Sequence, residues 1–183
     1  MNKIIAIVGM CGSGKSIASD YYESLGFKKI YFGGVTLEKM KEEGLEVNAE
    51  NEKYMREKLR SEYGMGAYAT LLLPRIREYF QEGNVILDGL YSWDELKILK
   101  NEFKNDLYVL AIVVDKATRY NRLNVRDIRP LTNDEAEKRD ISEIENIQKA
   151  GPISYADYYV LNNDDIERYK LDLENITKKI MEN

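Results

Sequence analysis

Residues 9–16 of the chain, GMCGSGKS, constrain its fold more than any other stretch. They match the pattern G-x-x-x-x-G-K-[ST], with a β-branched apolar run at residues 3–8 before them and a helical pattern from Lys15 onward. Glycines let a backbone curl into a nest of N–H groups that face a phosphate, and the following helix adds its positive N-terminal end. The full match in this context favours a nucleoside triphosphate site over a glycine-rich turn that binds nothing.

Two side chains of this loop carry defined chemistry. Lys15 is placed to reach the outer phosphates as a catalytic residue, and the hydroxyl of Ser16 is placed to bind Mg²⁺, so we expect ATP and Mg²⁺ as cofactors. Cys11 fills a free position of the pattern, where a tolerated small residue is a better interpretation than a redox sensor. The residues expected to hold the nucleotide here are Gly9, Cys11, Gly12, Ser13, Gly14, Lys15, Ser16 and Ile17.

Apolar runs alternate with longer amphipathic stretches along the whole chain, which predicts βαβ units and a parallel sheet. The expected strands are residues 3–8, 28–32, 85–88, 107–114 and 158–161. The expected helices are residues 15–25, 36–43, 50–80, 93–103, 117–123, 134–148 and 165–181, the long one interrupted at Gly64 and Gly66 and bent or restarted near Pro74. No repeat or linker divides them, so we predict one α/β domain over residues 1–183.

Composition excludes several classes of function. There is no histidine and only one cysteine, which removes Ser-His-Asp and Cys-His mechanisms, thiolate zinc sites and internal disulfides. The net charge of -5 argues against a general nucleic-acid binder. The longest apolar run is too short to cross a bilayer and no cleavage site follows it, so we expect a cytoplasmic protein without a membrane contact or a signal peptide.

Asp88 closes the buried strand at residues 85–88. Ligands collect at the carboxyl ends of such strands, where a carboxylate can hold a water of the Mg²⁺ shell or orient the attacking group. The alternative is a cap for the helix that begins near Ser92. A hydrophobic strand that ends in Asp favours the first interpretation, and we expect Asp88 to be a catalytic and metal-site residue.

Four arginines, Arg119, Arg122, Arg126 and Arg129, fall within eleven residues. Arginines on a mobile segment can close over transferring phosphates and spread the developing charge. The alternative is a solvated charged helix that pairs with the acidic residues around it. Because a phosphate-binding loop stands in the same chain, we expect catalytic roles for Arg122, Arg126 and Arg129.

Asn162 and Asn163 follow the last predicted strand. Amides at a strand end can contact a purine, but an Asn-Asn-Asp-Asp run is also ordinary turn and cap chemistry. Tyr63 and Tyr68 are candidates to line a second pocket, although most of the 14 tyrosines are expected to pack in or near the core.

With these features in order, the chain resembles the nucleoside monophosphate kinase-like branch of P-loop proteins, which includes adenylate kinase and dephospho-CoA kinase. The nearest likeness is to an adenylate-kinase-related family known mainly from archaea. The residues that carry the resemblance are 8–16, 62–64, 85–89, 118–123, 138–140 and 156–158.

This resemblance implies a three-layer fold with a five-stranded parallel sheet in the order 2-3-1-4-5. It also implies a helical acceptor-binding segment at residues 33–82 and a short arginine-bearing lid at residues 125–133. The adenine of ATP would lie near Arg122 and the turn after Val160, which makes Asn162 a nucleotide-binding candidate.

The chain departs from its relatives on the acceptor side. They carry Gly-Asp-x-x-Arg after the second strand and Asp-Gly-x-Arg after the third, where this chain has Gly34 and Leu37, and Tyr91. Losing such phosphate clamps weakens acceptor binding unless other cations substitute. Arg60 is the best-placed substitute, ahead of Arg56 and Arg75, and the expected acceptor residues are Gly34, Arg60, Tyr63 and Tyr91.

Two functions follow from these observations. The first is a kinase, a monomer or homodimer, that moves the γ-phosphoryl group of Mg-ATP to a small nucleotide-like acceptor such as a nucleoside monophosphate or dephospho-CoA. The second is a regulatory ATP-binding protein or slow ATPase with a degraded acceptor site. The arginine-rich lid favours the kinase, because holding a nucleotide does not require so much positive charge.

Overall fold

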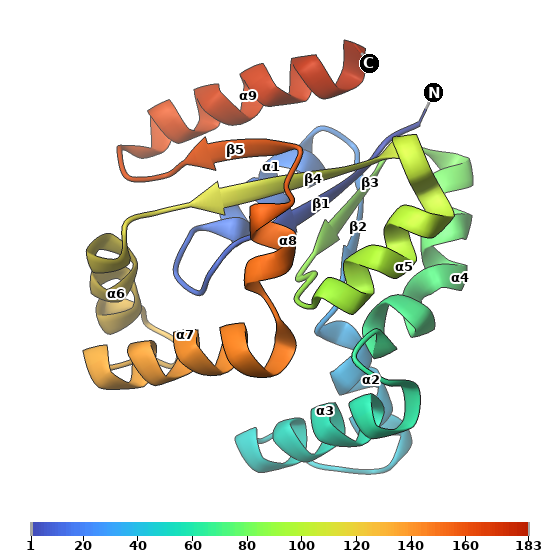
Figure 1. Cartoon of the computed structure of the whole chain (residues 1–183), viewed down its shortest axis with the longest axis vertical. Helices are drawn as coiled ribbons and strands as arrows, with labels where there is room; N and C mark the ends of the chain where they lie inside the picture. Colours follow the sequence, from blue (N-terminus) through green and yellow to red (C-terminus); the bar gives the residue numbers. More distant parts are fainter. Residues whose placement is uncertain (1, 183) are drawn as a thin grey trace.

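The computed structural model describes residues 2–182 of the chain, and its centre is a five-stranded parallel sheet (Figure 1). The strand order is β2-β3-β1-β4-β5. The strands are β1 (Ile4–Val8), β2 (Lys28–Tyr31), β3 (Val85–Asp88), β4 (Leu107–Val113) and β5 (Tyr158–Leu161). The predicted fold class and strand order are therefore confirmed.

Helices connect and cover these strands. They are α1 (Lys15–Ser24), α2 (Gly34–Glu42), α3 (Ala49–Tyr63), α4 (Ala67–Glu82), α5 (Trp93–Phe103), the 3₁₀ turn η1 (Lys104–Asp106), α6 (Lys116–Val125), α7 (Asn133–Ile147), α8 (Ala150–Ser154) and α9 (Ile166–Glu182). None of the helices within residues 2–182 combines the length and the apolarity needed to cross a bilayer.

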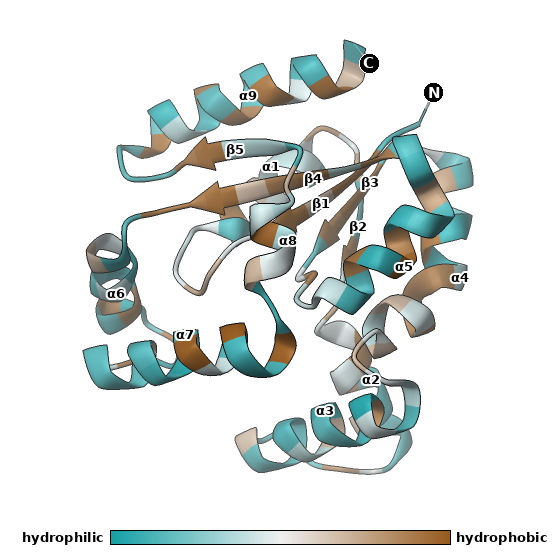
Figure 2. Cartoon of the chain, in the orientation of Figure 1, coloured by the Kyte–Doolittle hydropathy of each residue, from teal (hydrophilic) through white to brown (hydrophobic). Residues whose placement is uncertain are grey.

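Strand β1 is buried on both faces, which explains its unbroken apolar sequence. Ile5 and Ile7 pack with α1 and α9, while Ile4, Ala6 and Val8 pack with α2, α3, α4 and α5. The apolar colouring follows the sheet, and the exposed sides of α3 and α9 are hydrophilic (Figure 2). Two apolar layers therefore hold the sheet rigidly at the centre.

The structure differs from the predicted elements in two places. The long helical stretch divides at Gly64–Gly66 into α3 and α4, but α4 continues through Pro74 without a restart, because its inner face packs in the core. The short helix α8 was not predicted, since five residues with a Gly and a Pro give no periodic pattern. Pro152 is tolerated there because it lies in the first turn of the helix.

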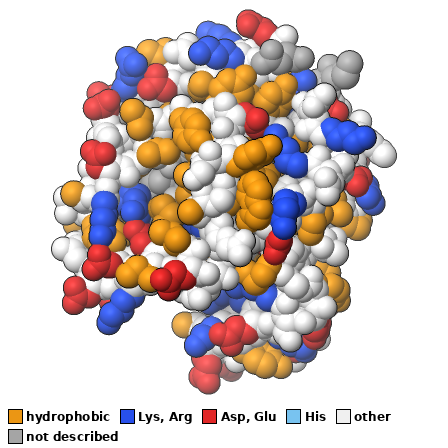
Figure 3. Space-filling view, viewed as in Figure 1, with side chains coloured by type: hydrophobic (Ala, Val, Ile, Leu, Met, Phe, Trp, Pro, Cys, Tyr) orange, Lys and Arg blue, Asp and Glu red, His pale blue; other side chains and the backbone are white. Residues whose placement is uncertain are grey.

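The carboxyl ends of the strands all open toward one edge of the sheet, where α6 and α7 stand on one side and α2 and α3 on the other (Figure 1). In the space-filling view the outline is indented between the part that carries α7 and the part that carries α3 (Figure 3). Ligands bind at this edge in open parallel sheets, so the search for a site begins here.

Candidate functional site

The loop between β1 and α1 has the backbone of a phosphate cradle. Gly12 and Gly14 adopt φ values of 81° and 90°, which favour glycine. A Cβ on Gly12 would lie 2.9 Å from the carbonyl oxygen of Arg119, and one on Gly14 would collide with the amide of Asn162. Glycine at these two positions therefore allows the tight loop shape in which backbone N–H groups can form a phosphate-binding nest.

Lys15 lies folded against its own loop. Its Nζ donates a hydrogen bond of 2.9 Å to the carbonyl oxygen of Met10. Burial, and next the positive charge of Lys149, lower the pKa of Lys15 to about 8, while Cys11, Glu143 and Asp88 oppose this shift. An anion that arrived in the cradle would offset the cost of burying this ammonium group.

Ser16 and Asp88, the two predicted Mg²⁺ residues, follow or end two neighbouring strands: Ser16 lies in the first turn of α1, after β1, and Asp88 ends β3. Ser16 is exposed, and Asp88 pairs in register with Ile7 of β1. Burial raises the pKa of Asp88, and the charges of Lys29 and Lys15 oppose the shift. Within residues 2–182 no group of three or more Cys, Asp or Glu side chains could hold a metal alone. One hydroxyl and one carboxylate beside phosphates fit Mg²⁺, which keeps several waters.

Arg122 and Asn162, both predicted for the nucleotide, lie together against the loop. Arg122 Nη2 donates to the carbonyl oxygen of Asn162 at 2.8 Å, and Asn162 Nδ2 donates to that of Ser13 at 2.9 Å. Tyr169 of α9 donates its hydroxyl proton to the carbonyl oxygen of Gly14. Arg122 Nη1 is buried with no hydrogen-bond partner among the described residues, which leaves a donor for a ligand.

Arg119 has a different place from the other three arginines of its cluster. Its guanidinium pairs with Asp140 of α7 at 2.6 Å, and Nη1 also donates to the carbonyl oxygen of Cys11 at 3.0 Å. Both side chains of the ion pair are largely buried. Arg119 therefore joins α7 to the phosphate-binding loop, a structural task that the spacing of the arginines did not reveal.

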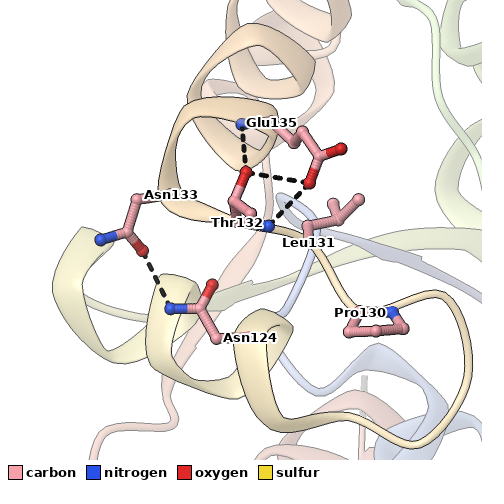
Figure 4. A pocket seen from close by; sticks show the side chains of 6 residues that line it. All are labelled: Asn124, Pro130, Leu131, Thr132, Asn133 and Glu135. Carbon is pink, nitrogen blue, oxygen red and sulfur yellow. Dashed lines mark hydrogen bonds between the residues drawn. The ribbon is translucent and has the colours of Figure 1, made fainter.

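The predicted lid begins at the end of α6 and leads to α7, which starts with a capping box made by Thr132 and Glu135. An open pocket of about 380 Å³ lies at this junction (Figure 4). It is lined by Asn124, Pro130, Leu131, Thr132, Asn133 and Glu135. The base of the lid is thus fixed, because Leu131 also donates its backbone N–H to the carbonyl oxygen of Leu123.

The structure does not bring the lid arginines Arg126 and Arg129 to the phosphate-binding loop. Arg126 Nε donates to the carbonyl oxygen of Arg129 at 2.6 Å. Arg129, which has a φ of 52°, forms an ion pair of 2.9 Å with Glu52 of α3. The lid is therefore attached to the predicted acceptor segment, on the other side of the site.

On that segment Arg60 of α3 is half-buried, and its guanidinium lies 5.7 Å from the ring centre of Tyr68. Its Nε is buried without a hydrogen-bond partner within residues 2–182. Tyr68 shares a buried hydrogen bond of 2.7 Å with Thr36 of α2. Tyr63 is exposed at the end of α3, so Tyr68 is the tyrosine that the structure places beside Arg60.

Glu95 of α5 is a second unsatisfied group on this side. One oxygen accepts the backbone N–H groups of Tyr91 and Ser92, while Oε1 is buried without a partner among the described residues. Burial raises the pKa of Glu95 to about 7, although those two hydrogen bonds and Arg60 oppose the shift. Gly34, the fourth predicted acceptor residue, begins α2 and has open space at the Cβ position, where the nearest atom is 3.9 Å away.

The structure adds three charged residues that the predicted site lacked. Lys149 lies before α8 with its Nζ 4.9 Å from the ring centre of Tyr91. Glu143 of α7 accepts from Lys149 at 2.6 Å and from Arg139 at 3.1 Å. Two features of the sequence pointed to part of this cluster: the four-residue spacing of Arg139 and Glu143, and the place of residues 138–140 among those that carry the family resemblance.

Comparison with known proteins gives the family. Residues 5–145 match the family described as AAA domain. A UPF0200 protein of Pyrococcus abyssi is 32% identical and aligns over 97% of each chain, and one of Methanococcus maripaludis is 34% identical over 98% of each. The chain belongs to the UPF0200 family. The expected resemblance to an archaeal P-loop family is thereby confirmed.

The fold of this UPF0200 protein is shared with small-molecule kinases. The solved shikimate kinase of Acinetobacter baumannii, in complex with shikimate, superposes with a TM-score of 0.62 at 17% identity, covering 100% of this chain and 94% of its own. At this identity the likeness concerns the fold alone. The UPF0200 chain therefore has a nucleotide-binding P-loop domain with a kinase-like fold.

Proposed function

We propose that this protein is an ATP-dependent phosphotransferase that moves the γ-phosphoryl group of Mg-ATP to a small nucleotide-like acceptor bound beside α2, α3 and α4. One observation carries the proposal: Arg129 of the lid is ion-paired with Glu52 of α3, so the segment between α6 and α7 reaches from the nucleotide side to the acceptor side. A lid that closes over two ligands excludes water from the transfer, which a protein that only retains a nucleotide does not need.

The proposed function assigns a role to each residue of the site. The loop backbone and Lys15 would hold the phosphates, and Ser16 and Asp88 would hold Mg²⁺, which would neutralise phosphate charge. Arg122 and Asn162, which are bonded to each other and to the loop, would contact the nucleotide. Arg60 would bind an anionic part of the acceptor, because its guanidinium lacks a carboxylate partner within the described residues. A phosphate acceptor needs no general base, since its oxygen is already ionised.

The second candidate is a regulatory protein or slow ATPase. It is favoured by Gly34 and Tyr91, which stand where kinase relatives carry an aspartate and an arginine. Both functions share the nucleotide site, so nucleotide binding alone does not separate them. Formation of a phosphorylated product separates the kinase from the ATPase.

A product scan by mass spectrometry tests the proposal. The purified protein is incubated with Mg-ATP and a pool of ribo- and deoxynucleoside monophosphates, dephospho-CoA and small alcohols. We expect one new phosphorylated species, which Lys15→Ala abolishes and Lys170→Ala, on the exposed surface of α9, leaves unchanged. ADP without a phosphorylated partner would instead support the ATPase, and no ADP would support a nucleotide-binding module.

A further inference from the structure

The junction of α7 and α8 holds more positive than negative charge. Glu143 is the one carboxylate bonded to both Arg139 and Lys149. The side chain of Lys149 is 2% exposed and that of Glu143 is 12% exposed, so this is a buried arrangement and not a surface ion pair. Buried charges need close compensation, and here two cations share one anion.

This cluster faces the phosphate-binding loop. Asp140, next to Arg139, is tied through Arg119 to the carbonyl oxygen of Cys11. Lys149 lies over Tyr91, three residues beyond Asp88. Of the charged groups that act on the pKa of Lys15, Lys149 is the strongest, after the effect of burial itself. Lys15 and the cluster therefore direct positive charge into one space, which favours an anion.

Arg139 is open to a ligand in that space. Its side chain is 47% exposed, and its single hydrogen bond runs from Nε to Glu143. Both Nη atoms are thus free of hydrogen bonds to the described residues, and a guanidinium fork binds phosphoryl oxygens in pairs. The lid arginines Arg126 and Arg129 are committed to the lid backbone and to Glu52 instead.

We propose that Arg139 and Lys149 form a phosphoryl-binding subsite opposite the P-loop. Arg139 contacts the phosphoryl oxygens, and Lys149 is a positioning residue that holds Glu143 and, through it, the guanidinium. The subsite rests on the proposed function, because it needs a nucleotide in the P-loop. A phosphoryl dianion of this kind is supplied by the γ-phosphoryl group of ATP or by a phosphate on the acceptor.

Isothermal titration separates these two sources. One arm compares the affinity for Mg-ADP with that for the Mg complex of adenylyl imidodiphosphate, which differ by the γ-phosphoryl group. The other arm titrates inorganic phosphate into protein that is already saturated with the Mg complex of adenylyl imidodiphosphate. The γ-phosphoryl position is then occupied, so added phosphate can bind only at a separate acceptor position. The variants are Arg139→Met, Lys149→Met and Lys149→Arg, with Lys138→Met, the exposed neighbour on α7, as the matched control.

We expect Arg139→Met and Lys149→Met to weaken binding in one of the two arms by about tenfold or more, because each variant loses a charged hydrogen bond. The affinity for Mg-ADP should stay within about threefold of the wild type. Lys149→Arg restores most of the loss, and Lys138→Met matches the wild type. A loss in the first arm assigns the γ-phosphoryl group, and a loss in the second assigns an acceptor phosphate.

The subsite is overturned if both arms are unchanged in Arg139→Met, which is exposed and keeps the protein folded even where Lys149→Met does not. It is also overturned if Lys149→Met lowers the unfolding temperature while both arms stay intact, because Lys149 then only supports the helix junction. Failure of the wild type to bind Mg-ADP would reject the proposed function itself, a result distinct from the other two.

Discussion

The two sides of the candidate site are held in different ways. On the nucleotide side the loop carbonyls of Cys11, Ser13 and Gly14 are bonded by side chains more than one hundred residues away. On the acceptor side no comparable set of long-range bonds to a loop is seen among the described residues, and one exposed ion pair attaches the lid. Buried polar atoms without partners occur on both sides, in Arg60 and Glu95 on the acceptor side and in Ser13 and Arg122 on the nucleotide side. The comparison suggests a nucleotide loop that is preorganised and an acceptor side that is completed by its ligand.

The largest effect on stability is expected from removing the ion pair that anchors α7 to the phosphate-binding loop. Arg119→Met leaves the buried Asp140 carboxylate without a counter-charge, although the Tyr120 hydroxyl still donates to it, so the free energy of unfolding in urea should fall by about 3–5 kcal/mol. The double variant Arg119→Met with Asp140→Leu should recover most of this loss. A decrease below about 1 kcal/mol in the single variant would show that the loop is not held by this pair.

Glu95 gives the next largest effect, through pH. Its folded pKa of about 7 lies above the usual value of 4.5, so the protonated form stabilises the fold fully below pH 4.5, and this contribution is lost as pH rises through 7. Relative to Glu95→Gln, the wild type should lose on the order of 3 kcal/mol of unfolding free energy across that window. Urea unfolding at several pH values measures this, with Glu78→Gln on α4 as the control.

A parallel pH dependence in wild type and Glu95→Gln would contradict the raised pKa. Saturation with an acceptor that bonds Glu95 or Arg60 should change the difference between the two proteins. The change would show that the unsatisfied groups of the acceptor side respond to a ligand.

Arg122→Ala tests nucleotide binding without a large change in stability. Removing a charged donor beside the loop should weaken ATP binding by about tenfold, while the unfolding temperature stays close to that of the wild type. Equilibrium titration with Mg-ATP measures the affinity. Arg168→Ala, which removes an exposed arginine of α9, is the control, and equal affinities in the two variants would remove Arg122 from the nucleotide site.

The smallest effect on stability is expected at the lid. Arg126→Ala should lower turnover several-fold more than it weakens ATP binding, because its charge acts only when the lid closes. Arg129→Ala breaks an exposed ion pair and should reduce the unfolding free energy by less than about 1 kcal/mol. Steady-state kinetics of the reaction found in the product scan decide the point, and equal losses in turnover and affinity would reject the lid role of Arg126.

Sequence reasoning predicted the parts of the molecule that depend on local patterns. The strand before the loop, the glycines and Lys15 are adjacent in the chain, so one octapeptide predicts them together with the fold class. The pairing of Arg119 with Asp140 and the place of Lys149 over Tyr91 could not be predicted. They join residues 21 and 58 positions apart, and only tertiary packing decides which charges meet.

On the acceptor side, too, the sequence could not predict which residues meet in the folded chain. The sequence alone shows that Gly34 and Tyr91 stand where the relatives carry an aspartate and an arginine. It does not show which polar side chains of other helices complete this side of the site. Tyr68 and Glu95 belong to α4 and α5, and their apolar neighbours look like core positions in the sequence. A buried polar atom without a partner has no sequence pattern, which is why the structure was needed to find it.

The single tryptophan of the chain has a useful position for spectroscopy. Trp93 begins α5 two residues after Tyr91, and its ring lies edge-on to Tyr155, with centres 5.4 Å apart, and against Gly151 of α8. Any shift of α8 changes the surroundings of this one indole. We therefore expect the intrinsic fluorescence of the unmodified protein to report ligand binding at the proposed Arg139 subsite, on the millisecond scale and without a label.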